Sequence, residues 1–227
     1  MDGQLGYWSL NVADTGRAKT FFGAVFGWSF GAPGSEGGIN VSDHWGGLHP
    51  ASLNVSPAAY AVADAVKAGA RIRELGGTTA ELREYEAGPY LEAVDPAGSR
   101  FGVWQPAPGF EPPAQPPARA GDIAYFVQAT PDLDRSRVFF ADLFGWTYGA
   151  PGSAGGLPIE GSAPLGFLGP GDIAGALTFG VADAETAVAA IRAAGGTADD
   201  PIGSPYGPYS SAVDDQGTRF AIFQGEA

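Results

Sequence analysis

Two histidines are the side chains of this sequence best suited to metal binding or to proton transfer near neutral pH. His44 and His49 lie within residues 41–49, and the chain contains no other histidine and no cysteine. With Asp43 they could form a set of two imidazoles and one carboxylate for a divalent ion. His44 could also serve as a general base, because the unperturbed pKa of histidine is close to neutrality. We favour a polar loop here, since the corresponding segment of the repeat described below, residues 159–168, has no histidine.

The charge balance argues against nucleic acid and membrane surfaces as partners. Lys and Arg total 12 against 25 Asp and Glu, a formal net charge of -13, and no basic cluster offsets it. Phosphate backbones and anionic lipids would be repelled over most of such a surface. The start of the chain has no signal-peptide pattern, and no apolar run approaches the roughly 20 residues that span a bilayer. We therefore expect a cytoplasmic monomer or homodimer whose acidity serves solubility.

The sequence contains an internal repeat. The segment at residues 21–28 returns at 139–146, and the register continues almost to the C-terminus with a shift of one residue. Between the copies lies a proline-dense segment, which favours an extended, semi-rigid linker. Each copy is long enough to bury a core of its own. We expect a domain at 1–106, a linker at 107–118 and a repeated domain at 119–227.

Each half contains two units in which a strand precedes an amphipathic helix. In the first half the strand at 6–12 is followed by an N-cap at Asp14 and a single apolar helix face over residues 18–26. The second unit of each half begins with a strand, at 58–62 and at 177–181. Short glycine-punctuated strands follow every helix. This order predicts four βαβββ modules and an α+β fold.

The module order and two motifs resemble the vicinal oxygen chelate superfamily, the group of glyoxalases, bleomycin-resistance proteins and extradiol dioxygenases. One motif is Phe-Phe-x-x-x-Phe-Gly-Trp at 21–28, and the other is Asp-Pro-x-Gly-x-Arg-Phe at 95–101, whose second copy at 214–220 lacks the proline. The chain is most similar to a tandem two-domain branch. The resemblance implies two glyoxalase-like domains, each a curved mixed sheet with helices on the convex face and a ligand cup on the concave face. Each cup could join adjacent modules or modules exchanged between the halves.

The same resemblance places the family's metal ligands at positions that lack suitable donors here. Carried over, these positions are Tyr7, Pro57 and Gly102 in the first half and Tyr125, Ala176 and Ala221 in the second. Proline, glycine and alanine side chains cannot ligate a divalent ion. A lone phenol with a pKa near 10 would not retain one at neutral pH. We expect no metal and no other cofactor.

Strand alternation predicts which side chains line the cups in place of an ion. The predicted lining is Tyr7, Ser9, Asn11 and Trp104 in the first half, and Tyr125, Val127 and Phe223 in the second. Tyr90 and Tyr209, in two Gly-Pro-Tyr sequences, could stand at the rims, although Gly-Pro also marks turns. Such walls suit a flat, apolar ligand with one or two hydrogen-bonding groups. The alternative is that these aromatic side chains fill the cups as core.

These features favour metal-independent binding of a small aromatic or apolar molecule, in a sequestering or resistance-type role. The alternative is a metal-free enzyme of the same superfamily, of lyase, isomerase or hydroxylase type. In that case proton transfer would pass through Tyr7 or Tyr125, with Glu92 or His44 as auxiliary base. A scaffold that acts through protein contacts is a third and weaker hypothesis.

Overall fold

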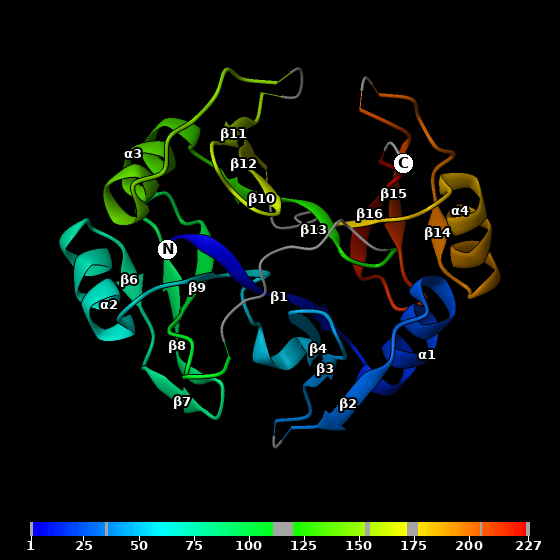
Figure 1. Cartoon of the computed structure of the whole chain (residues 1–227), viewed down its shortest axis with the longest axis horizontal. Coiled ribbons are helices and arrows are strands. Elements are labelled where there is room, and N and C mark those ends of the chain that lie inside the picture. Colours follow the sequence, from blue (N-terminus) through cyan, green and yellow to red (C-terminus); the bar gives the residue numbers. More distant parts are fainter. Residues whose placement is uncertain are drawn as a thin grey trace. The chain divides into compact units, whose positions relative to one another are not determined.

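A computed structural model gives the structure of residues 2–34, 36–110, 120–152, 155–171, 177–204 and 206–225 (Figure 1). Most of the linker predicted at 107–118, and Ala176 at a predicted ligand position, lie outside these described residues. No helix in the described ranges has the length and hydropathy needed to cross a membrane.

The helices and strands follow the predicted order of modules, except that four strands follow α2 and, among the described residues, two follow α3. The helices are α1 Thr15–Phe26, α2 Ala65–Glu74, α3 Leu133–Phe144, α4 Ala184–Ala193 and the short 3-10 helix η1 Ala51–Leu53. The strands of the first half are β1 Gln4–Val12, β2 Phe30–Pro33, β3 Ile39–Val41, β4 Gly46–Pro50, β5 Ala58–Ala61, β6 Thr78–Thr79, β7 Arg83–Tyr85, β8 Gly88–Val94 and β9 Arg100–Trp104. Those of the second half are β10 Ile123–Thr130, β11 Leu157–Ile159, β12 Leu165–Pro170, β13 Leu177–Gly180, β14 Thr197–Ala198, β15 Tyr209–Val213 and β16 Arg219–Phe223.

Each half of the sequence supplies one mixed sheet. In the first half the strands run in the order β2-β3-β4-β1-β5-β9-β8-β6, with β7 paired to β8, and in the second half β11-β12-β10-β13-β16-β15-β14. The pairs β5–β9 and β13–β16 are parallel, whereas neighbours such as β1–β5 and β8–β9 are antiparallel. Helices interleave with these strands, which confirms the predicted α+β fold class.

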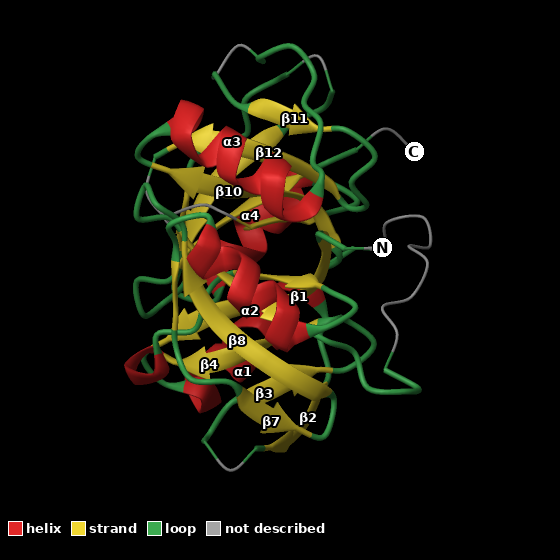
Figure 2. Ribbon diagram, turned by 90° about the vertical axis from the view of Figure 1, so that its left-hand side faces the viewer, coloured by secondary structure: helices red, strands yellow, loops and turns green. Residues whose placement is uncertain are grey.

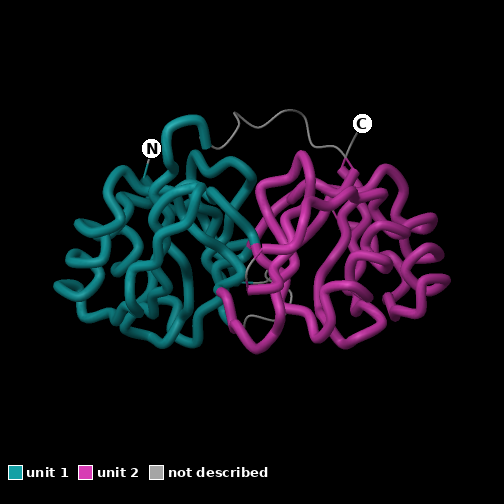
Figure 3. The backbone as a smooth tube through the Cα atoms, turned by 90° about the horizontal axis from the view of Figure 1, so that it is seen from below, with its two compact units in different colours: residues 1–8, 56–114, 127–173 teal, residues 9–55, 115–126, 174–227 magenta. Residues whose placement is uncertain are grey.

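The compact units of the structure do not coincide with the two halves of the sequence (Figure 3). Unit 1 comprises residues 1–8, 56–114 and 127–173, and unit 2 comprises residues 9–55, 115–126 and 174–227. Helices α2 and α3 therefore belong to unit 1, and helices α1 and α4 to unit 2. The sheets, by contrast, join the two adjacent modules of one half, through the pairs β1–β5 and β10–β13, so they follow one of the two arrangements that the sequence left open. The boundaries of the repeated domains themselves stay a prediction.

The first helix of each half begins and ends as its sequence predicts. Asp14 and Asp132 are the N-caps of α1 and α3, and each carboxylate accepts a hydrogen bond from the backbone N–H three residues later. Gly27 and Gly145 end the helices with left-handed φ values of 71° and 72°. Glycine adopts this conformation without the steric penalty of a Cβ atom.

In unit 2, helix α1 of the first half packs on strands of the second half. The ring centroid of Phe22 lies 5.4 Å from that of Phe220 on β16. The ring of Phe26 lies 5.3 Å from Phe179 on β13. Phe22 is fully buried. The apolar face predicted for this helix therefore covers strands of the other copy of the repeat.

Unit 1 has the same arrangement with the halves reversed, and Figure 2 shows its two helices, α2 and α3. Phe140 of α3 lies 5.1 Å from the ring of Phe101 on β9. Trp146, just after the helix, lies 5.0 Å from Tyr60 on β5. Phe140, Phe101 and Tyr60 are all fully buried. The helix-facing side of the first-half strands is thus covered by a helix of the second half.

A buried carboxylate of unit 1 is satisfied by a hydroxyl that unit 2 lacks. Asp95 accepts hydrogen bonds from two backbone N–H groups and from the hydroxyl of Ser136. Its counterpart Asp214 also accepts from two backbone N–H groups. Among the described residues, however, its Oδ2 atom is buried with no hydrogen-bond partner. The repeat has alanine, Ala18, where unit 1 has Ser136.

Replacing Ala18 by serine is therefore expected to stabilise the protein by about 1 kcal/mol, because the new hydroxyl can donate to the unsatisfied oxygen of Asp214. Differential scanning calorimetry would show the gain as a rise in Tm of roughly 2–4 °C. The matched control is Ala65→Ser, since Ala65 is equally buried but, within the described ranges, the unsatisfied buried carboxylate oxygens belong to Asp214 and Asp215 of the other unit. A fall in Tm for Ala18→Ser equal to that of the control would contradict the prediction.

Candidate functional site

Four paired residues form a row across the first-half sheet within unit 1. Tyr7 on β1 pairs with Ala59 on β5, Ala59 pairs with Gly102 on β9, and Gly102 pairs with Glu92 on β8. Residues that are directly opposite in a sheet point to the same face. The adjacent residues Tyr60 on β5 and Phe101 on β9 point to the other face, where their rings contact Phe140 of α3. The row therefore lies on the sheet face that points away from α3.

The carboxylate of Glu92 is the charged centre of this face. Its Oε1 atom accepts hydrogen bonds from the Ser56 N–H at 2.9 Å and from the Tyr90 hydroxyl at 2.6 Å. Its Oε2 atom accepts from the Ser56 hydroxyl and lies 3.5 Å from Nη2 of Arg100. The side chains of Glu92 and Arg100 are 22% and 27% exposed. These four residues, termed the Glu92 cluster, hold the carboxylate in one orientation that solvent still reaches.

The phenol of Tyr90 occupies the space above Gly102. A Cβ atom at position 102 would lie 2.6 Å from the Tyr90 hydroxyl oxygen, closer than real Cβ contacts. Position 102 is where the family resemblance places a metal-ligating carboxylate, so Tyr90 fills the volume that such a side chain would need. Burial, with a further contribution from Glu92, raises the pKa of Tyr90 well above its ordinary value. The phenol therefore remains a neutral donor to the carboxylate.

Tyr7 lies where the sequence places it, but it is no base at neutral pH. Burial raises the pKa of its phenol well above the ordinary value, so the group stays protonated. The register of β1 shifts between Leu5 and Tyr7, which leaves Gly6 as an extra residue. A Cβ atom on Gly6 would lie 2.9 Å from the ring of Trp104, so glycine permits a close approach there.

The second half carries the equivalent row in unit 2, without a charged group. Tyr125 pairs with Thr178, Thr178 with Ala221, and Ala221 with Ser211. The hydroxyl oxygens of Tyr209 and Ser211 are 3.2 Å apart. Burial raises the pKa of Tyr125, and a hydrogen bond with Thr178 opposes that shift. Since serine stands where the first half has Glu92, the two rows have diverged in charge.

Of the other predicted lining residues, Ser9 and Trp104 are buried and the rest are partly exposed. The Asn11 amide donates to the Val55 carbonyl at 2.7 Å and accepts from the Val55 N–H at 3.0 Å, so it fixes the backbone before β5. Ser9 and Trp104 are 3% and 5% exposed, and Trp104 donates to the Ala87 carbonyl. Phe223 packs against Tyr125, and the side chain of Val127 packs near Gly169. Tyr90 and Tyr209 lie within strands β8 and β15. A ligand-binding role for these side chains stays a prediction.

The histidine segment contacts a carboxylate in unit 2. The Nδ1 atom of His44 lies 2.8 Å from Oδ1 of Asp122, and the His44 side chain is 12% exposed. Its ring also lies 5.7 Å from Trp28. Over the described ranges no group of three His, Asp or Glu side chains is arranged to hold a metal ion. The hypothetical set of Asp43, His44 and His49 is therefore not assembled.

The donors of the first-half row do not fit the metal centre that the family resemblance implies. Gly102 offers no ligand atom, and the space of a side chain there is taken by Tyr90. Ala59 on β5 offers none, and Tyr7 remains a protonated phenol. The single carboxylate, Glu92, already accepts three hydrogen bonds. No catalytic step through an ion is assigned to this row.

Two members of the Glu92 cluster were missed by the sequence-based interpretation. Arg100 belongs to the closing motif and lies two residues before Gly102, so strand alternation places it on the same face. That parity could have identified it. Ser56 lies just outside β5 and reaches Glu92 through both its backbone N–H and its hydroxyl. No pattern in the sequence signals this contact.

The fold matches solved structures over the whole length of the chain. The 2,3-dioxygenase LapB from Pseudomonas sp. KL28 is 16% identical with a TM-score of 0.72, and the match covers 100% of this chain and 94% of that one. The homoprotocatechuate 2,3-dioxygenase from Brevibacterium fuscum, in complex with 3,4-dihydroxyphenylacetate, is 19% identical with a TM-score of 0.68, covering 100% and 81%. The Mn(II)-bound glyoxalase from Novosphingobium aromaticivorans is 16% identical with a TM-score of 0.73, covering 99% and 83%. No protein-family model and no curated protein sequence matches the chain.

These matches overturn the functional hypothesis drawn from the sequence. That hypothesis was metal-independent sequestration of a small aromatic or apolar molecule, with metal-free catalysis as its alternative. The proteins that share the fold include catechol and homoprotocatechuate 2,3-dioxygenases and a glyoxalase that binds Mn(II). The hypothesis was wrong because missing ligands at a few positions exclude one coordination geometry and do not define a function.

Proposed function

We propose, on the premise that this chain has the fold of the vicinal oxygen chelate superfamily, that it is an enzyme acting on a small hydroxylated aromatic compound at the Glu92 cluster. The observation that carries the proposal is a single oriented carboxylate, Glu92, opposite Gly102 on the face that points away from α3. Two of the solved structures with this fold are named for catechol-type compounds, catechol and homoprotocatechuate.

The cluster offers complementary groups for an aromatic hydroxyl. At 3.5 Å, the contact between Oε2 of Glu92 and Arg100 is longer than a hydrogen bond, so a substrate hydroxyl can donate to the carboxylate from that side. The guanidinium group beside it then stabilises negative charge on the substrate oxygen. The neutral phenol of Tyr7 lies in the same row and supplies a polar group for a second hydroxyl.

The test uses catechol and 3,4-dihydroxyphenylacetate as probes, with the purified protein assayed in air with and without added Fe(II) or Mn(II). Consumption of the probe is measured by chromatography and its binding by calorimetry. We expect Glu92→Gln to weaken binding at least about tenfold, which corresponds to about 1.4 kcal/mol, because the amide presents no negative charge to the hydroxyl. Consumption of the probe should fall with it.

The matched control is Glu84→Gln, since Glu84 is an exposed carboxylate on β7 outside the cluster. A second variant, Tyr90→Phe, removes one donor to Glu92 but keeps its charge, and it should fall between the wild type and Glu92→Gln. Thermal unfolding of each variant shows whether the fold is retained. If the wild type neither binds nor consumes any of the probes, or if Glu92→Gln behaves like the control, the proposal fails.

A further inference from the structure

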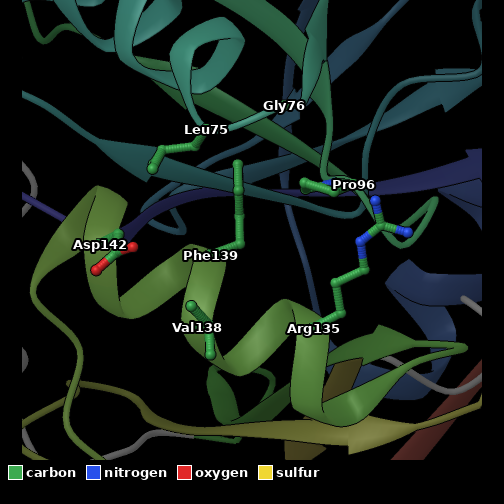
Figure 4. Close-up of a pocket in the computed structure, with 7 residues that line it drawn as sticks. All are labelled: Leu75, Gly76, Pro96, Arg135, Val138, Phe139 and Asp142. Atoms are coloured by element: carbon green, nitrogen blue, oxygen red, sulfur yellow. The ribbon is translucent and has the colours of Figure 1, made fainter.

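Unit 1 has a groove along helix α3 (Figure 4). It lies on the helix side of the strands, where Phe139 packs against Phe101, and so opposite the face that carries Glu92. The groove has a volume of about 370 Å³ and lies between the end of α2, the β8–β9 turn and helix α3. Its lining consists of Leu75, Gly76, Pro96, Arg135, Val138, Phe139 and Asp142. All seven residues belong to unit 1, and none is part of the Glu92 cluster.

The equivalent arginine of unit 2 binds a carboxylate that has no counterpart beside Arg135. Its counterpart in unit 2 is Arg17, whose Nε and Nη2 atoms bind the Asp215 carboxylate at 3.2 and 2.7 Å. In unit 1 the position of Asp215 is taken by Pro96, which has no acceptor. Within the described part of unit 1 no carboxylate forms an ion pair with Arg135. Unit 1 therefore has the equivalent arginine, Arg135, without the carboxylate that binds it in unit 2.

The other lining residues differ from the repeat in the same region. Asp142, Val138 and Leu75 replace residues 24, 20 and 194 of unit 2, which are alanine, threonine and alanine. Val138 is 54% exposed, so the middle of the groove presents apolar surface to solvent. Unit 1 has thus gained a negative charge and an apolar floor where unit 2 has small or polar side chains.

The two charges stand at opposite ends of this floor. Arg135, Val138, Phe139 and Asp142 have the spacing that places residues on one helix face, and Figure 4 shows Arg135 and Asp142 at the two ends, with Val138 and Phe139 between them. Seven residues of α-helix separate positions 135 and 142 by roughly 10 Å along the axis. A ligand that satisfies both ends needs a negative and a positive group about this far apart, joined by an apolar chain.

We propose that the groove binds a small zwitterion, with its carboxylate paired to Arg135, its ammonium group paired to Asp142 and its apolar chain lying over Val138. The ligand's carboxylate takes the place of the Asp215 carboxylate of the repeat. Arginine suits this role because its planar fork binds a carboxylate through two N–H groups. This inference is independent of the function proposed for Glu92, because it concerns the other face of the sheet.

The experiment titrates the full chain with ω-aminooctanoic acid, and with octanoic acid and octylamine as analogues that lack one charge each. Binding is followed by amide chemical shifts in NMR spectra. We expect saturable binding of the zwitterion with shifts at the groove residues, and binding at least about tenfold weaker for either analogue. Arg135→Gln and Asp142→Asn should each remove this tenfold preference over the analogue that lacks the corresponding group.

Two further variants make the result decisive. Pro96→Asp restores the carboxylate of the repeat, in a turn where two backbone N–H groups donate to the Asp95 carboxylate as their counterparts donate to Asp214. It should pair with Arg135 and abolish zwitterion binding while the protein stays folded. Arg137→Gln, an exposed arginine of the same helix outside the groove, should bind like the wild type. Absence of saturable binding, equal binding of all three compounds, or undiminished binding by Pro96→Asp would overturn the proposal.

Discussion

Replacing Phe140 by alanine is expected to lower the free energy of unfolding of unit 1 by about 3–5 kcal/mol. Phe140 is fully buried and lies within 5.0–6.4 Å, between ring centroids, of five other rings. Three of these rings lie on α3 or just after it, and the other two lie on the strands β5 and β9 that α3 covers. Truncation removes the apolar contact and leaves a cavity that rigid aromatic neighbours cannot collapse to fill.

Urea-induced unfolding followed by circular dichroism measures this loss. Val138→Ala is the control on the same helix, and it should change the free energy by less than about 0.5 kcal/mol because Val138 is largely exposed. Phe22→Ala, at the same position of the repeat, should match Phe140→Ala in size, since Phe22 is equally buried between α1 and β16. A loss below about 1 kcal/mol for Phe140→Ala would show that α3 does not hold these strands.

Replacing Gly88 by alanine is expected to cost about 3 kcal/mol, because two penalties combine at this residue. Its φ of 115° is one that side chains disfavour, and a Cβ atom would lie 2.1 Å from the carbonyl oxygen of Gln105. The chain on both sides is fixed by backbone hydrogen bonds, from Gln105 to Pro89 and from Ala107 to Ala87. Neither segment can move aside without breaking these bonds.

The control for this substitution is Gly98→Ala. Gly98 also has a positive φ, of 98°, but nothing lies within 4 Å of a Cβ atom there. Its cost should therefore be about 1 kcal/mol, from backbone strain alone. The difference between the two variants, from urea unfolding, isolates the steric term. Equal costs would mean that the backbone around Gly88 relaxes, contrary to what its hydrogen bonds indicate.

The Gly88 contact also shows what the Gly-Pro-Tyr sequences do. The sequence allowed either a tyrosine at the rim of a cup or a turn. In the structure the glycine permits the close approach of two backbones, and Tyr90 follows on the strand as a donor to Glu92. The repeat keeps the same geometry at Gly207, where a Cβ atom would lie 2.0 Å from the Gln224 carbonyl oxygen.

Local patterns predicted the secondary structure well because helix caps and apolar faces are local properties. Asp14 and Gly27 bound the first helix as expected, and the repeat bounds the third in the same way. The partner of the helix was not predictable. Phe22 and Phe26 form an apolar face that suits any similar sheet, and the two copies of the repeat offer nearly identical strands.

The candidate site was predicted only in part, for a similar reason. Strand alternation placed Tyr7 and Gly102 on one face, and their pairings through Ala59 agree with this. The role of Glu92 depends on contacts across strands and from a loop, which alternation does not encode. The Tyr90 ring above Gly102 likewise depends on which rotamer the surrounding structure allows. Side-chain direction follows from sequence, whereas side-chain partners follow from the assembled sheet.

The covering of each sheet by a helix of the opposite copy bears on how such a chain can be divided. A fragment ending before the proline-dense segment would retain α1 but lack the phenylalanines at 179 and 220 that bury it. In a dimer of two identical fragments, the first helix of each could pack on the strands of the other. In a duplicated and fused chain both copies of the helix are present in one polypeptide. Each copy can then change its polar residues separately, as the difference between Glu92 and Ser211 illustrates.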